Sequence, residues 1–300
     1  MASATRLGVA LLVIVIWSAC FVVIKASQGE APALLYGALR ALLGGLPLLG
    51  VAAATGRLRP PPGLWRWLAL LAVANTTLGL GGMFLSVGLA GAAIPGVLAN
   101  SQALLVAPFA AWLFGEALTL SRLLALLLGL AGVALTMPWS GQPRGTASGA
   151  ALALSAAAGL AAANLIIKHI GPAVDALTAT AWQYLLGALP LLAASTLLER
   201  AAPVFWTPRF VAGLLFLGLV GSAGASWMWY VLVRDGELIW LNALTLLTPA
   251  FALLLALVLY REPLQPSGLV GVAAVLGGVT WLGRPPGSRQ GRAASQGRQP

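Results

Sequence analysis

The sequence ALRALLGGLPLL, residues 38–49, returns as AWQYLLGALPLL at residues 181–192, 143 positions further along the chain. After a three-residue insertion the offset becomes 146, which aligns Glu116 with Glu262. A Leu-, Ala- and Gly-rich chain produces some chance matches, but these do not bring Pro and Glu into register at equivalent places. We infer that the chain consists of two copies of one structural unit.

The composition excludes a water-soluble protein. Hydrophobic residues make up 60% of the 300 residues, and charged residues only 8%. Soluble domains are about 45–50% apolar and about 25% charged. The 17 basic and 7 acidic side chains are too few to cover a soluble protein of this length. A single cysteine also excludes a scaffold built on intramolecular disulfides.

Long apolar runs between Pro, Gly and Arg residues have the length of about 20 residues that a membrane-spanning helix needs. They lack the alternation of membrane β-strands, so helices are expected. The ten runs are 6–26, 31–54, 64–89, 94–115, 119–138, 147–168, 175–198, 208–233, 237–260 and 264–283. The expected fold is an all-α polytopic membrane protein with ten transmembrane helices.

Five spans fall in each copy, so the second copy enters the membrane with the opposite orientation. The expected domains are a five-helix repeat at 1–141, an inverted five-helix repeat at 142–283, and a basic tail at 284–300 that we expect to be disordered. Inverted repeats around a central cavity are typical of secondary transporters, in which one half rocks against the other to alternate access.

The basic residues predict the orientation. Arg and Lys are concentrated in the loop at 57–66 and in the tail, and cytoplasmic segments carry such an excess. We therefore expect both termini in the cytoplasm. The net charge of +10 is interpreted as a topology signal and not as a nucleic-acid surface.

Several motifs resemble the EamA-type drug/metabolite transporter superfamily. They are WSACFVVIK at 17–25, Arg40 in the second span, FGEALT at 114–119, and REPL at 261–264 in the second copy. The resemblance covers residues 6–283 and includes bacterial aromatic and hydrophobic amino-acid exporters. It implies ten helices in the bacterial cytoplasmic (inner) membrane. It also implies a substrate cavity between the halves, lined by the first, third, fourth, sixth, eighth and ninth spans.

Polar and small residues cluster in the spans that would line this cavity. In the third span they recur at three- or four-residue steps, which places them on one helical face. The expected polar substrate contacts are Asn75, Gly79, Asn100, Asn164, Ser226 and Thr245; Ser222, Asn242 and Thr248 belong to the same set, and Gln102 is expected to point away from Asn100. The alternative is that these groups join helix to helix, at roughly 0.6 kcal/mol each.

Aromatic residues inside the spans suggest a binding site with an apolar wall, since Trp and Tyr otherwise mark the membrane interfaces. The expected wall residues are Trp17, Met83, Phe84, Trp229 and Tyr230. Such a wall suits an amphipathic solute. Facing lipid is the alternative for either Trp227 or Trp229, because neighbours in a helix cannot share a face.

Arg40 is the one charge well inside a span, where a buried arginine costs at least about 2.5 kcal/mol. Its counterpart in the second copy is Gln183. Arg40 could bind a substrate carboxylate, or it could be structural and pair with helix-end carbonyls or with Glu30. Both interpretations stay open at the level of the sequence.

All seven acidic residues fall at helix ends or in loops, so no carboxylate is placed to carry a proton or sodium ion at mid-membrane. Glu116 and Glu262 are each expected to cap the start of the next helix. The single histidine, His169, lies at a helix end. Pro249 is the expected gating hinge. These features favour facilitated diffusion or exchange over ion coupling.

The sequence therefore predicts a transporter that exports small amphipathic metabolites, with aromatic or hydrophobic amino acids first. The alternative is an exporter of drug-like or other metabolites, which could be proton-coupled. One His, one Cys and no buried carboxylate leave little from which to build an enzyme. No cofactor or metal is expected, and the expected partners are a small-molecule substrate and the lipid bilayer, with the chain a monomer.

Overall fold

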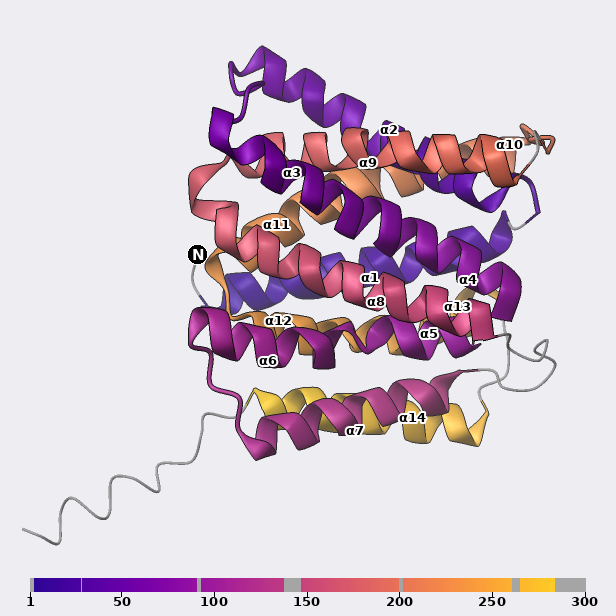
Figure 1. Ribbon diagram of the computed structural model, residues 1–300. Coiled ribbons are helices and arrows are strands. Elements are labelled where there is room, and N and C mark those ends of the chain that lie inside the picture. The colour runs from indigo at the N-terminus through magenta and orange to yellow at the C-terminus, as the bar shows by residue number, and fades with distance from the viewer. Residues whose placement is uncertain are drawn as a thin grey trace, which may run out of the picture.

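The computed structural model describes residues 3–27, 29–90, 93–137, 147–199, 202–260 and 265–283. All regular structure in these residues is helical. The helices lie side by side and run between the two ends of the bundle (Figure 1). The all-α class is therefore confirmed, while the tail at 284–300 lies outside the described residues.

Two consecutive sets of helices correspond to the two sequence copies. The first set is α1 (Ser3–Ala26), α2 (Ala33–Ala54), η1 (Pro62–Leu64), α3 (Trp65–Leu71), η2 (Ala72–Gly81), α4 (Gly82–Ala90), α5 (Ala93–Asn100), α6 (Gln102–Phe114) and α7 (Leu120–Thr136). The second set is α8 (Ala147–Ile170), η3 (Gly171–Ala173), α9 (Ala176–Leu198), α10 (Pro208–Leu215), η4 (Phe216–Gly224), α11 (Ala225–Asp235), α12 (Leu238–Thr245), α13 (Leu247–Tyr260) and α14 (Pro266–Leu282).

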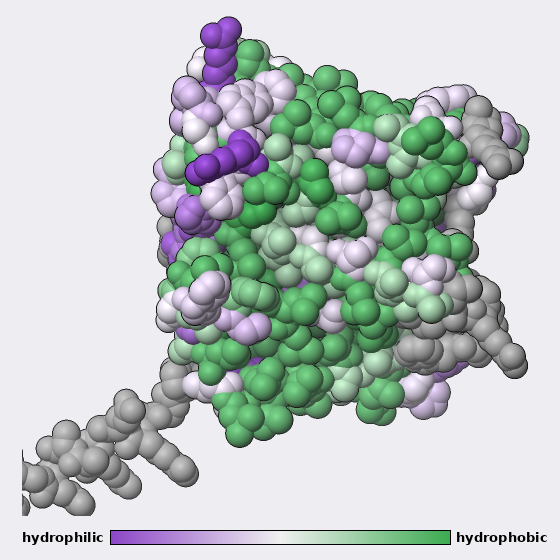
Figure 2. Space-filling view, in the orientation of Figure 1, coloured by the Kyte–Doolittle hydropathy of each residue, from purple (hydrophilic) through white to green (hydrophobic). Residues whose placement is uncertain are grey.

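Eight helical stretches in the described part of the chain are long and apolar enough to cross a bilayer. The two other predicted spans correspond to α7 and α14, apolar helices of 17 residues each, at the short end of the spanning range. The chain is thus a multi-pass membrane protein, and the total of ten crossings stays a prediction. Apolar residues dominate the visible face, and hydrophilic residues gather toward the left end of the view (Figure 2).

Helix α7 packs against α14 (Figure 1). The contacts between them are related by the same offset as the two sequence copies. A Cβ on Gly132 would lie 2.7 Å from the Gly271 carbonyl oxygen, and a Cβ on Gly278 would lie 2.6 Å from the Ala125 carbonyl oxygen. The offset of 146 converts one contact into the other. The glycines let the two backbones touch, the arrangement that holds helices together in lipid.

A second symmetric pair of contacts joins α2 to η4 and α9 to η2. A Cβ on Gly44 would lie 2.7 Å from the Ser222 Cβ, and one on Gly187 would lie 2.4 Å from the Thr76 Cβ. Gly44 and Gly187 are related by the offset of 143, and Thr76 and Ser222 by the offset of 146. The inverted repeat is therefore expressed in helix contacts as well as in sequence.

Four predicted spans are not uniform α-helices. The third and eighth contain π-helical segments at equivalent positions, η2 and η4. The fourth and ninth, predicted as continuous runs, are interrupted at Ser101 and Leu246. Pro249 follows the second break by three residues and has no N–H to donate to the Thr245 carbonyl, which weakens the helix there. Its role as a hinge stays a prediction.

We expect Gly278→Ala to destabilise the protein, because the new methyl group would meet backbone atoms of α7 at 2.6–2.9 Å. Overpacking of this kind costs about 1–3 kcal/mol. The matched control is Gly277→Ala, whose nearest neighbour would be Leu128 Cδ2 at 4.0 Å. Thermal unfolding in detergent should show a lower midpoint for the first variant and no change for the second. Equal midpoints would contradict the packing described for α7 and α14.

Candidate functional site

The indoles of Trp17 on α1 and Trp229 on α11 meet where the two halves touch. Their ring centroids are 5.2 Å apart and the rings are tilted by 56°. Trp17 Nε1 donates a hydrogen bond to the Gly221 carbonyl oxygen at 3.3 Å, and Trp229 Nε1 donates to Asn164 Oδ1 at 2.9 Å. Two of the predicted wall residues and one predicted polar contact are thus brought together.

The hydrogen bonds continue from Asn164 on α8 into α12. Asn164 Nδ2 donates to Asn242 Oδ1 at 2.9 Å, and Asn242 Nδ2 donates to the Leu238 carbonyl oxygen at 3.0 Å. Asn242 is completely buried. Both amides are buried, and a buried polar group is stabilised only if it has a hydrogen-bond partner.

Thr245 carries the connection back to the first half. Its hydroxyl donates to the Asn242 carbonyl oxygen at 2.7 Å and accepts from Gln102 Nε2 on α6 at 3.3 Å. The Gln102 Oε1 atom is buried and has no hydrogen-bond partner in the described part of the chain. We call Trp17, Trp229, Asn164, Asn242, Thr245 and Gln102 the central chain.

Trp227 and Trp229 lie two positions apart on one helix, so their side chains point in different directions and differ in exposure. Trp227 is 42% exposed, and Trp229 is 5% exposed. Trp229 therefore faces the bundle, as the prediction for the apolar wall requires, and Trp227 faces outward.

A second aromatic cluster contains the predicted wall residue Phe84. Its ring centroid lies 5.7 Å from that of Tyr36, which lies 5.1 Å from Phe210. Cys20, Leu214 and Leu217 complete the buried cluster, and Trp17 packs against it. The Trp pair and this cluster are thus neighbours.

Ser226 and Tyr230 are both buried in α11 near the Trp pair. The Ser226 hydroxyl is 2.6 Å from the Tyr184 hydroxyl on α9. Tyr230 is 1% exposed, and its hydroxyl has no hydrogen-bond partner among the described residues. Tyr184 is not among the predicted site residues, although it lies well inside the predicted span at 175–198, the same signal that selected Trp229 and Tyr230.

The predicted single face of the third span does not persist through that span. The i→i+5 bonding of η2 widens each turn, so residues four apart no longer align as they do in an α-helix. Gly79 packs against α8, where a Cβ would lie 2.8 Å from Leu160 Cδ2. Asn75 and Met83 are half-buried. Their substrate contacts, like that of Gly79, stay predictions.

The break at Ser101 changes which amide of the fourth span reaches the other half. Asn100 Nδ2 donates to the Gly96 carbonyl oxygen of its own helix at 2.6 Å. Gln102, expected to point away from the site, is the residue that bonds to Thr245. The sequence could not show this, because a break rotates the faces on either side of it by an unknown amount.

Arg40 on α2 is 8% exposed, and its Nε donates to Ser222 Oγ on η4 at 2.9 Å. Glu30, the carboxylate considered as its structural partner, instead accepts from the Thr207 hydroxyl at 2.9 Å. The pairing of Arg40 with Glu30 is therefore wrong.

The acidic residues within the described chain lie at helix ends, and several cap a helix of the opposite half. Glu116 does not cap the next helix as expected. Its two oxygens accept from the Leu238 and Ile239 backbone N–H groups of α12 at 2.6 and 2.8 Å. Thr119 caps the next helix instead. Glu262 lies outside the described residues.

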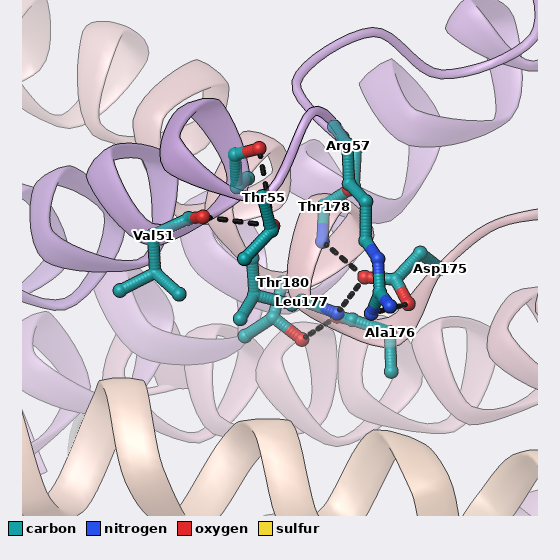
Figure 3. A network of polar contacts seen from close by, with 9 residues as sticks. Val51, Thr55, Arg57, Asp175, Ala176, Leu177, Thr178 and Thr180 are labelled. Carbon is teal, nitrogen blue, oxygen red and sulfur yellow. Dashed lines mark hydrogen bonds and ion pairs between the residues drawn. The ribbon is translucent and has the colours of Figure 1, made fainter.

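The end of the bundle at which α1 begins, here called the N-terminal end, has further polar contacts. Arg122 pairs with Glu237 of the other half, and within the second half Lys168 donates to the Gly236 carbonyl oxygen. Arg57 pairs with Asp175 at 3.4 Å, and the same carboxylate caps α9 (Figure 3).

His169 lies at the N-terminal end of the bundle, with its ring centroid 4.8 Å from that of Trp67. Among the described residues, no group of three or more His, Cys, Asp and Glu side chains could hold a metal ion. The polar groups able to orient a ligand are therefore amides, hydroxyls and Arg40.

Comparisons with known proteins agree with this architecture. The model of the EamA-like transporter family matches residues 6–137 and 147–284. An uncharacterized transporter from Synechocystis sp. is 31% identical and covers 87% of this chain and 84% of its own length. A probable amino-acid metabolite efflux pump from Salmonella typhimurium is 29% identical, with coverage of 90% and 92%.

One solved crystal structure superposes with a TM-score of 0.80 at 21% identity, over 93% of this chain and 97% of that one, and shows the same fold. The family match and the names of the relatives indicate a transporter and not an enzyme.

We expect Asn164→Leu to lower stability, because it leaves Trp229 Nε1 and Asn242 Oδ1 without partners. Two interhelical hydrogen bonds in a membrane are worth roughly 1–2 kcal/mol together. The matched control is Asn100→Leu, whose amide bonds only within its own helix. The melting midpoint in detergent should fall for Asn164→Leu and change little for Asn100→Leu. The reverse order would show that the hydrogen bonds of Asn164 do not hold the helices together.

Proposed function

Because the chain belongs to the EamA-like transporter family, we propose that it is a facilitative or exchange transporter that exports small amphipathic metabolites by alternating access. Aromatic and hydrophobic amino acids are its leading substrates. The observation that carries this proposal is the central chain, in which Trp and amide side chains of both halves converge. The printed name of the Salmonella relative supports a metabolite of the amino-acid class.

The chemistry of these residues suits a molecule with one apolar and one polar end. The Trp17 and Trp229 rings supply apolar surface, and an aromatic ring can stack on them for about 0.5–1.5 kcal/mol beyond the burial of its area. The amides supply donors and acceptors that are bound within the protein in this structure, Asn164 to Asn242 and Gln102 to Thr245. A substrate that takes over these bonds would separate the halves without leaving amides unpaired.

The distribution of charge supports transport without ion coupling. Each acidic residue in the described part of the chain lies at a helix end and pairs there, as Glu116 and Glu237 do. No carboxylate therefore lies beside the central chain to load and release a proton or sodium ion. His169, the residue to mutate if a proton-coupled drug exporter were the correct alternative, contacts Trp67 at the N-terminal end.

Alternating access requires that one end of the bundle closes while the other opens. In this structure the halves are joined at the N-terminal end by the Glu116 cap on α12 and by the pairing of Arg122 with Glu237. We propose that these contacts break when the site opens to that end. The basic residues at 57–66 and in the tail support a cytoplasmic location for it, in the bacterial inner membrane, with the chain acting as a monomer.

The decisive measurement is flux of radiolabelled phenylalanine, tryptophan, leucine and glutamate in proteoliposomes, with and without an imposed proton gradient. We expect saturable flux of the three apolar amino acids, independent of the gradient. Trp17→Ala should abolish it because the mutation removes the indole that contacts Trp229. Trp227→Ala removes the same side chain from an outward-facing position and should leave flux unchanged.

The outcomes separate the parts of the proposal. No flux of any amino acid would refute the substrate class and favour drug-like or other metabolites. Flux that follows the proton gradient would refute the uncoupled mechanism, and equal loss in both Trp variants would refute the specific role of Trp17.

We expect Glu116→Ala to open the N-terminal end, because it removes the acceptor for two backbone N–H groups of α12. With Cys20 replaced, a cysteine introduced at Gln102 reports this opening through its reaction with a membrane-impermeant maleimide. Bonds to a charged group are worth about 1.5–3 kcal/mol, so labelling from that end should rise about tenfold.

The matched control is Glu199→Ala. Glu199 caps α2 through the Leu34 and Leu35 N–H groups at the opposite end of the bundle. Its removal should not increase labelling from the N-terminal end. Equal labelling in the two variants would show that the Glu116 cap does not control access.

A further inference from the structure

The guanidinium of Arg40 is a buried cation with a neutral partner. Its Nε binds Ser222 Oγ at 2.9 Å, and that is the only hydrogen bond of its side chain within the described part of the chain. An arginine has five N–H donors, so the four on its two terminal nitrogens have no protein acceptor there. A buried cation in a membrane normally pairs with an anion or faces a watery cavity.

The nearby acids of the described chain do not pair with Arg40. Glu30 Oε1 accepts from Thr207 while its buried Oε2 has no partner among the described residues, and Glu199 accepts from the Leu34 and Leu35 N–H groups. The other acids in the described ranges, Glu116, Asp175, Asp235 and Glu237, lie at helix ends on the N-terminal side. None of the described carboxylates forms an ion pair with Arg40.

One glycine connects the guanidinium with the Trp pair. A Cβ placed on Gly221 would lie 3.4 Å from Arg40 Nη2 and 2.5 Å from Cys20 Sγ. The Gly221 carbonyl oxygen accepts the hydrogen bond of Trp17. Arg40 and the Trp17 indole therefore flank the same glycine.

The second half lacks this charge. Gln183 takes the place of Arg40, and Thr76 takes the place of Ser222. Thr76 Oγ1 donates to the Gln183 backbone oxygen at 3.2 Å, and Gln183 Oε1 is buried without a partner in the described residues. Because the surrounding helix contacts are equivalent, the fold does not need an arginine at this place.

We propose that Arg40, held by Ser222, binds the carboxylate of the transported molecule, whose apolar part lies against Trp17 and the Tyr36–Phe84 cluster. The substrate class is thus an aromatic or other apolar carboxylate. This inference rests on the proposed transport function, and it makes Arg40 the residue that determines specificity for the charged group. Planar, charge-assisted binding of this kind is the usual way in which Arg recognises carboxylates.

The test compares carboxylates with their neutral amides on the purified full-length protein. The pairs are phenylalanine with phenylalaninamide and phenylacetate with phenylacetamide, and binding is measured by ligand-induced thermal stabilisation in detergent. The unmodified protein should bind each carboxylate about 10- to 100-fold more tightly than its amide. Arg40→Gln should reduce this preference to near unity, while Arg40→Lys keeps part of it.

Arg40→Gln is expected to fold, because Gln183 occupies the equivalent place in the second half. Its melting temperature without ligand tests this directly. If it does not fold, the preference of the unmodified protein and the partial preference of Arg40→Lys decide. Arg209→Gln is the matched control, because that arginine is exposed at the end of the bundle opposite the N-terminal end and, among the described residues, donates only to the Ala26 carbonyl oxygen.

The two levels of the proposal fail differently. No preference for carboxylates in the unmodified protein, or an unchanged preference in Arg40→Gln, would overturn the role of Arg40. A carboxylate preference that depends on Arg40, without flux of any amino acid, would support this site and refute amino-acid transport.

Discussion

The structure depends on the pairing of polar groups in a medium without water. Asn164 illustrates the constraint: its oxygen accepts from Trp229 and its nitrogen donates to Asn242, so one amide joins three helices. In lipid these bonds have no solvent competitor, and separating the helices leaves each group unpaired until another partner arrives. In the proposed mechanism a ligand with its own donors and acceptors is that partner, which would link binding to movement of the halves.

The repeat gives each half equivalent helix contacts, and these contacts hold the bundle together. Glycine contacts such as Gly132 on Gly271 and Gly278 on Ala125 recur under the offset of the two copies, and they hold α7 on α14 without any polar group. The polar contacts at the N-terminal end are different, since in the proposed mechanism the Glu116 cap on a helix of the other half breaks when that end opens.

The two copies have equivalent helix contacts but differ in charge at one position. This difference distinguishes a residue needed for binding from one needed for folding. Arg40 and Gln183 occupy equivalent places beside equivalent helix contacts, yet only one of them carries charge. A residue needed for packing alone would tolerate the same side chain in both copies. The difference is explained if one half binds the charged group of a substrate and the other does not.

Much of the architecture followed from the sequence alone. A helix of about 20 apolar residues is the cheapest way to satisfy a backbone in lipid, so the spans and their inverted repeat could be predicted from hydropathy and register. Trp17 and Asn164 could also be selected from the sequence as candidate site residues, because aromatic and amide groups deep within a span need a partner.

Only the tertiary structure decided which side chains meet. The π-helical turns of η2 removed the face predicted for Asn75 and Gly79, and the break at Ser101 brought Gln102 to Thr245 in place of Asn100. The capping of α12 by Glu116 joins residues 122 positions apart. Helical periodicity predicts neighbours only while the helix is regular, and contacts between halves depend on how packed helices rotate about their axes.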